Sequence, residues 1–116
     1  MTLVERIEAA RSPLWSEWGL ADEVADFVGI GKRNKRARAR LWSALNGDTG
    51  AALSFARGRH PCWAWSVGQN VHTGMWLAYA LALGDDRAPY QPTSATAYGP
   101  ALALVAAVLR AKEGEG

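Results

Sequence analysis

The longest weakly polar stretch of the chain, residues 61–84, dominates its hydrophobic pattern. On a helical wheel its polar side chains fall into one narrow stripe: Ser66, Gln69, Asn70 and Thr73. From Met75 to Leu83 the apolar character continues all the way round, which is typical of a helix buried by other helices. We therefore expect a central helix here. Gly68 and Gly74 each cost about 1 kcal/mol relative to alanine inside a helix, so they mark either a break or a close approach.

A second apolar run, residues 100–112, carries five alanines among leucine and valine. It is also apolar all round, so we expect it to pack against the small-residue face of the first helix. The two would form an inner pair of apolar helices. Residues 85–93 contain two prolines and are predicted to be a loop between them.

Shorter helices are expected on the N-terminal side. Thr2 and Glu5 form a capping-box pattern that predicts a first helix of about ten residues. Residues 12–19 predict a short second helix with Trp15 and Trp18 in the core. Further helices are expected at 20–28, at 32–46 and at 49–58, with Gly47 ending one and Asp48 or Thr49 capping the next. Since no period-2 strand pattern of useful length is present, the predicted fold class is all-α: a single domain, residues 1–116, forming a compact bundle of five or six helices.

Composition narrows the class of protein. A chain of 116 residues with 49% apolar and 21% charged residues is long enough for one real core. Its one cysteine, Cys62, excludes an internal disulfide and fits a reducing compartment. The N-terminal residues lack the pattern of a signal peptide, and the longest apolar run is shorter than the roughly 20 residues that cross a membrane. We therefore expect a cytoplasmic protein that does not engage a membrane.

The charge distribution supplies the main functional clue. The formal net charge is +2, yet residues 32–59 carry eight basic and one acidic residue, a net of +7. Six of the thirteen basic residues lie between Lys32 and Arg40. On a wheel, one face is cationic: Lys32, Arg33, Lys35, Arg36 and Arg40. The other face carries Ala37, Leu41, Ala44 and Leu45.

This pattern predicts a basic amphipathic helix, at about 32–46, that engages nucleic acid or another polyanion. Arg57 and Arg59 lie one hairpin away and are expected to extend the patch. The alternative is a solvated face that the acidic residues of the helix at 20–28, Asp22, Glu23 and Asp26, neutralise within the fold.

A turn precedes the basic helix. Phe27-Val28-Gly29-Ile30-Gly31-Lys32, between two short helices, resembles the helix-hairpin-helix DNA-binding motif. The resemblance covers about residues 21–45 and implies that amides near Gly29 and Gly31 offer N–H groups to phosphate at a helix start. Val28 stands where the family usually has proline, and Lys35 stands where it has a small packing residue. Residues 34–55 are also compatible with a helix-turn-helix, although any helical hairpin gives the same pattern.

No motif indicates catalysis. The sequence contains no phosphate-binding loop, no nucleophile elbow and no convincing carboxylate pair. His60, Cys62 and His72 match no common zinc spacing, so we expect neither a metal nor a cofactor.

The predicted function is a small non-enzymatic binding module that engages nucleic acid through its basic helix. The alternative is a protein–protein interaction or inhibitor/immunity-type module docking on an acidic protein surface, with tryptophans as anchors. The type of nucleic acid and the oligomeric state stay open. So does the role of the polar stripe, which either lines a pocket, faces a second chain or faces solvent.

Overall fold

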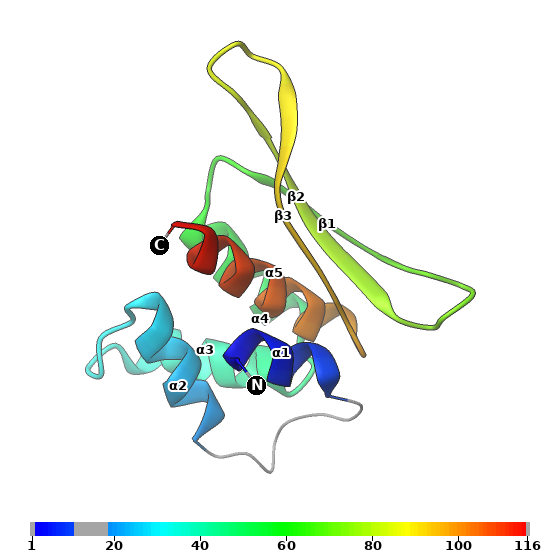
Figure 1. Ribbon diagram of the computed structural model, residues 1–116. Helices are drawn as coiled ribbons and strands as arrows, with labels where there is room; N and C mark the ends of the chain where they lie inside the picture. Colours follow the sequence, from blue (N-terminus) through cyan, green and yellow to red (C-terminus); the bar gives the residue numbers. More distant parts are fainter. Residues whose placement is uncertain (1, 11–18, 116) are drawn as a thin grey trace.

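The computed structural model describes residues 2–10 and 19–115 of the chain. Five helices and three strands occur within these ranges, in this order: α1 Leu3–Ala9, α2 Leu20–Val28, α3 Lys35–Leu45, α4 Thr49–Arg59, β1 Ala64–Gln69, β2 Trp76–Leu83, β3 Pro89–Ala97 and α5 Pro100–Glu115. The three strands form one antiparallel sheet in the order β1-β2-β3. The sheet lies on one side of α5, and α1, α2 and α3 lie on the other side (Figure 1).

The prediction of an all-α helical bundle is therefore wrong, and so is the inner pair of helices. Residues 61–84 form the β1–β2 hairpin instead of a helix, and much of the predicted loop at 85–93 belongs to β3. The helix α5 is real, but its partner is the sheet. The expected helix at 12–19, with Trp15 and Trp18, lies outside the described residues.

The strand period of β2 is hidden because both of its faces are apolar. Ala78, Ala80 and Ala82 are buried on the face toward α5, whereas the alternate positions are large. The alternation is one of size rather than polarity, so a hydrophobicity pattern cannot distinguish this strand from a buried helix. The helix propensity of alanine and leucine is weak enough for tertiary packing to override it.

The polar stripe turns out to belong to the hairpin. Asn70 Oδ1 accepts hydrogen bonds from the amides of His72 (2.9 Å) and Thr73 (3.3 Å), and Gln69 Nε2 donates to the Gly74 carbonyl (3.1 Å). Gly74 has φ 75°, a conformation that favours glycine. The stripe therefore does not form one face: Ser66 lies within β1, whereas Gln69, Asn70 and Thr73 lie at the hairpin turn, where these hydrogen bonds fix the chain.

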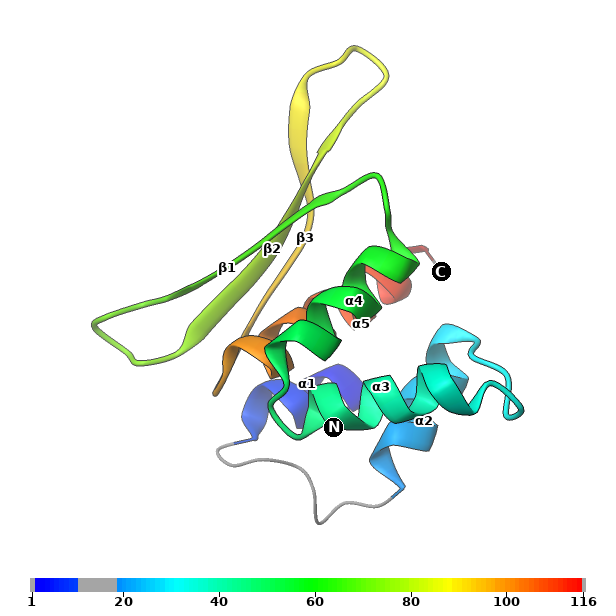
Figure 2. The same cartoon turned by 180° about the vertical axis from the view of Figure 1, so that it is seen from behind.

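None of the five described helices covers the face of the sheet that is turned away from α5 (Figures 1 and 2). We call it the outer face. From the alternation and register of the strands, it comprises Ala64, Ser66, Gly68, Leu77, Tyr79, Leu81, Leu83, Ser94 and Thr96. Both hairpins of the sheet extend beyond α5, one at each end (Figure 1).

The core is built around α5. Residues 101–109 of this helix are all buried, and the helix packs against β2 and β3 on one side and against α1, α3 and α4 on the other. Small residues on the sheet, among them Ala78, Ala95 and Ala97, let the helix approach closely. Thr93 is buried there because its Oγ1 donates to the Ala107 carbonyl at 2.7 Å. The prediction of a helix that is apolar all round is confirmed for this element.

The remaining helices lie where their sequence patterns predict them, except that the basic helix expected at 32–46 begins only at Lys35, after the Asn34 cap. Thr2 caps α1 by accepting from the Glu5 amide at 3.2 Å, as the capping box predicts. Gly47 has φ 103° in the turn between α3 and α4, and Asp48 caps α4 by accepting from the Ala51 amide at 3.0 Å. An ion pair between Arg110 and Glu8 joins α5 to α1. Among the described residues no helix combines the length and apolarity needed to span a membrane.

Candidate nucleic-acid interface

The connection between α2 and α3, together with the first half of α3, holds most of the basic residues predicted to bind an anion. Gly29 ends α2 in a left-handed conformation, φ 84°, and the Ile30 amide donates back to the Ala25 carbonyl at 2.8 Å. The chain then turns, and Asn34 starts α3 by accepting from the Ala37 amide at 3.2 Å. Both ends of this connection are therefore fixed by hydrogen bonds, one to a backbone carbonyl and one to the Asn34 side chain.

Arg38 fastens the connection from inside. Its guanidinium lies 2.8 Å from Asp22 Oδ1 and 2.8 Å from Asp26 Oδ1, and its side chain is only 13% exposed. It also donates to the Ile30 carbonyl (2.7 Å) and the Gly31 carbonyl (3.2 Å). The hydrogen bond to Asp26 is the main reason that the pKa of Arg38 is raised, against the opposing effect of burial. One arginine thus ties α2, the turn and α3 together.

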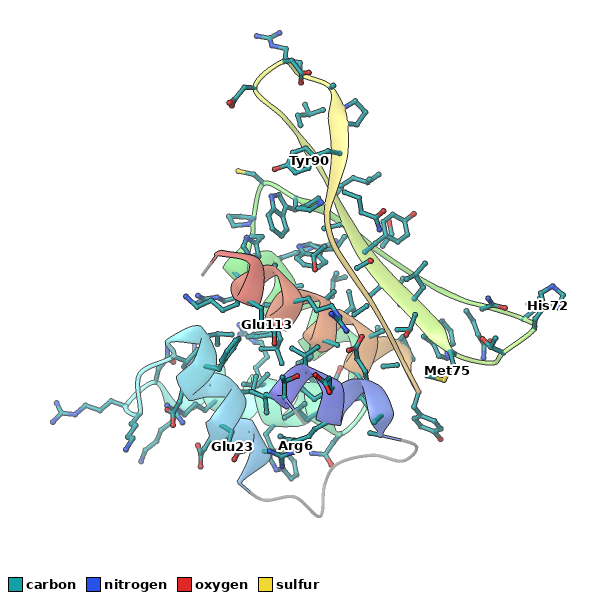
Figure 3. The ribbon with its side chains drawn as sticks, in the orientation of Figure 1. Arg6, Glu23, His72, Met75, Tyr90 and Glu113 are labelled. Atoms are coloured by element: carbon teal, nitrogen blue, oxygen red, sulfur yellow. The ribbon has the colours of Figure 1, made fainter. Side chains whose placement is uncertain are left out.

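The other five basic residues of this segment point outward. We call them the cationic surface: Lys32, Arg33, Lys35, Arg36 and Arg40. All five are exposed, and none forms an ion pair with any residue in the described ranges. Figure 3 shows nitrogen-tipped side chains extending from the α2–α3 connection away from the body of the molecule. The structure thus exposes all five, although Lys32 and Arg33 precede α3 and do not lie on a face of that helix.

The acidic helix does not neutralise this surface. Asp22 and Asp26 are engaged by Arg38, and Glu23 pairs with Arg6 of α1 at 2.7 Å (Figure 3). The acidic row of α2 therefore neutralises one arginine of the basic segment, Arg38, which sequence analysis assigned to neither face of the predicted helix.

Arg57 and Arg59 are exposed at the end of α4, but they lie apart from the cationic surface. α3 and α4 diverge from their shared turn, so the end of α4 lies near the C-terminal end of α5, away from the start of α3 (Figures 1 and 2). An aromatic group follows these arginines. The His60 ring stacks on Trp63 with centroids 3.8 Å apart, and Trp65 lies 5.8 Å from Trp63. The two tryptophans are two positions apart, a strand spacing that sequence analysis overlooked.

The helix-hairpin-helix expectation fits the structure only in part. Gly29 adopts the left-handed turn conformation, and both Gly29 and Gly31 are exposed. However, α3 begins at Lys35, four positions after Gly31, and Asn34 caps its first turn. The amides of the glycine turn are therefore separate from the amides at the start of α3. Anion binding here would depend on the side chains of the cationic surface more than on the glycine turn.

The three candidate metal ligands do not converge. His60 stacks on Trp63 at the end of α4, Cys62 is exposed beside it, and His72 lies at the tip of the β1–β2 hairpin (Figure 3). Within residues 2–10 and 19–115, no three histidine, cysteine, aspartate or glutamate side chains gather in a manner suited to a metal ion.

Comparison with protein-family models, with curated proteins and with solved structures gives no match for the chain. Its function must therefore be inferred from the physical properties of its exposed surfaces.

Proposed function

We propose that this protein is a non-enzymatic module that binds nucleic acid through the phosphate backbone, using the cationic surface of α2 and α3. The observation that supports the proposal is a difference among the basic residues of one segment, residues 32–40. The single arginine that turns inward is paired twice, while five exposed basic residues have no ion-pair partner among the described residues. Phosphate is the commonest partner for such a surface.

The arrangement is costly for the isolated fold. Arg36 and Arg40 are four positions apart in α3, and like charges at this spacing repel by a few tenths of a kcal/mol. Lys35 and Arg36 also occupy the first turn of α3, where the positive end of the helix dipole disfavours cations. An anionic ligand would relieve both effects, which supports a binding role.

The chemistry of the side chains also suits phosphate. Arg33, Arg36 and Arg40 present planar guanidinium groups that can hold two phosphate oxygens at once, and Lys32 and Lys35 add mobile point charges. The rigid anchoring by Arg38 holds these groups on one surface before any ligand arrives. Preorganised charges bind with less loss of conformational entropy.

The test is a binding titration of labelled duplex and single-stranded oligonucleotides over a series of salt concentrations. For a duplex, the slope of log affinity against log salt should fall in magnitude by about 0.9 for every phosphate contact removed. Arg33→Ala combined with Arg36→Ala should therefore bind more weakly and with a slope reduced by roughly 2. The circular dichroism spectrum should not change, since both side chains are exposed.

The matched control is Arg87→Asn. Arg87 lies in the β2–β3 turn at the opposite end of the molecule (Figure 1) and has φ 62°, which asparagine tolerates. The Arg87→Asn variant loses one positive charge, as the single variant Arg36→Ala does. Its affinity for the oligonucleotide should nevertheless stay nearly unchanged. If wild-type protein shows no affinity even at low salt, or if both single variants weaken binding equally, the proposal fails. An acidic protein surface would then be the next partner to test.

A further inference from the structure

On the outer face of the sheet, β2 presents a row of large apolar side chains that are not buried in the core. On β2, Leu77 is 40% exposed, Leu81 43% and Leu83 70%, with Tyr79 half-buried between them. These side chains alternate with the buried alanines under α5, so the large residues of this strand face outward and the small ones inward. Burying such leucines in an interface would remove substantial apolar surface from water.

The outer face is uncharged. Its residues on β1 and β3 are small and neutral: Ala64, Ser66, Gly68, Ser94 and Thr96. The nearest cluster of charges, Asp85, Asp86 and Arg87, lies in the turn at one end of the sheet. A surface without charge does not repel a copy of itself, which distinguishes it from the cationic surface on the other side of the molecule.

The two ends of this face differ in shape. At the β1–β2 end there is a hollow of about 560 Å³ whose lining includes Gly68, Leu77, Tyr79 and Thr96. Gly68 leaves it open, because a Cβ atom added there would meet nothing within 4 Å. At the other end, beside Leu81 and Leu83, the hollow is smaller, about 220 Å³, and Leu83 is 70% exposed. Under a two-fold rotation the exposed Leu83 of one copy faces the larger hollow of the other.

We propose that a second copy of this chain packs on the outer face, forming a two-fold symmetric dimer with its axis near Tyr79. In this arrangement Leu81 of each copy lies over Leu77 of the other, and Leu83 enters the hollow beside Met75. The sheets stack at about 10 Å with their strands roughly aligned, and each α5 stays on the outside. The charged turn at 84–88 then lies over the partner's β1–β2 turn rather than over its own copy.

The area predicts a weak dimer. Eight residues of strand at about 3.3 Å each and three strands about 4.8 Å apart give a face of roughly 25 by 15 Å. A standard interface covers about 800 Å² on each partner, so the strands alone supply about half of it. The hairpins that extend beyond α5 add the rest of the contact. We therefore expect a monomer–dimer equilibrium in the micromolar range rather than a permanent dimer.

The experiment is sedimentation velocity of the full chain from low to high micromolar concentration. Wild-type protein should shift from the 12.5 kDa monomer toward twice that mass. Leu77→Glu and Leu81→Lys should each remain monomeric, because each places a charge against the partner's apolar row. The two positions are matched in exposure, so both variants should keep the wild-type circular dichroism spectrum.

Mixing these two variants tests the arrangement itself. A dimer of one Leu77→Glu chain and one Leu81→Lys chain would place a glutamate opposite a lysine at one contact and two leucines at the other. The mixture should therefore recover the dimer that neither variant forms alone. As a control, Phe27→Lys on the helical side should dimerise like wild type, and its new lysine is well placed to pair with Glu23 one turn away.

Three outcomes would overturn the proposal. Wild-type protein that stays monomeric at every concentration would show that the face has some other occupant. A dimer that survives both charged substitutions would show association through the sheet edges or the helices. Failure of the mixture to recover the dimer would exclude the two-fold arrangement near Tyr79. If either variant unfolds, Leu83→Lys, at the most exposed position of the row, replaces it in the test for loss of the dimer, and the mixture is then made from Leu83→Lys and Met75→Glu, which lie opposite each other across the axis.

Discussion

The cationic surface and the outer face of the sheet both expose side chains that folding does not require, and they do so in opposite ways. In α3 one arginine turns inward and is fully paired, while the basic residues around it face solvent. In β2 the inward residues are alanines and the outward ones are leucine and tyrosine. One surface has surplus charge and the other surplus apolar area, so we expect different partners for them.

The largest difference in stability is expected between a substitution on the inward side of α3 and one on the outward side of β2. Leu41 is fully buried in the core, so Leu41→Ala should lower the free energy of unfolding by about 2–5 kcal/mol. Leu83→Ala, at an exposed position, should change it by no more than about 0.5 kcal/mol. Urea denaturation at low protein concentration measures both, and equal effects would contradict the assignment of the two faces.

Overpacking should have the next largest effect. Ala78 and Ala106 are fully buried, in β2 and α5 respectively. Ala78→Leu and Ala106→Leu should each cost about 1–3 kcal/mol, because the helix and sheet approach each other through small residues. Leu77→Ala, the neighbour of Ala78 on the outer face, is the control and should cost much less. An unchanged melting temperature for both leucine variants would disprove the close approach of α5 to the sheet.

A smaller difference in melting temperature should distinguish Arg38 from Arg40 in α3. Arg38→Ala removes four contacts that join α2, the turn and α3, so it should lower the melting temperature and weaken nucleic-acid binding indirectly. Arg40→Ala should leave the melting temperature unchanged and weaken binding directly. Arg38→Lys should rescue little, because an ammonium group cannot reproduce the planar fork of a guanidinium. Equal melting temperatures for Arg38→Ala and Arg40→Ala would contradict the anchoring role.

The sequence predicted the basic segment better than it predicted the fold. The clustering of Lys32 to Arg40 is a property of composition, and it is visible although the helix begins at Lys35 rather than at the expected Lys32. The predicted caps at Thr2 and Asp48 are local, and the structure places each at the start of a helix, whereas the cap at Asn34 was missed. Local signals of this kind do not depend on contacts with residues that are distant in the sequence.

The sheet could not be predicted in the same way, because its signals compete. Alanine and leucine favour helices, and the period of β2 is one of size, which becomes visible only when α5 is known to cover one face. Two signals did point to strands: the two glycines, Gly68 and Gly74, and the alternation of Trp63 and Trp65. Two glycines make a helix at residues 61–84 unfavourable, and this cost is a stronger indication of its secondary structure than the apolar run around them.

The most direct test of the nucleic-acid proposal is to map the bound surface residue by residue. Amide nitrogen–proton correlation spectra of labelled protein, recorded during titration with a duplex oligonucleotide, report which amides change. We predict that the changes centre on residues 32–40 and disappear at high salt, while amides of β1 and β2 stay unchanged. Changes centred on the outer face of the sheet, or no changes at low salt, would contradict the assignment of nucleic-acid binding to the cationic surface.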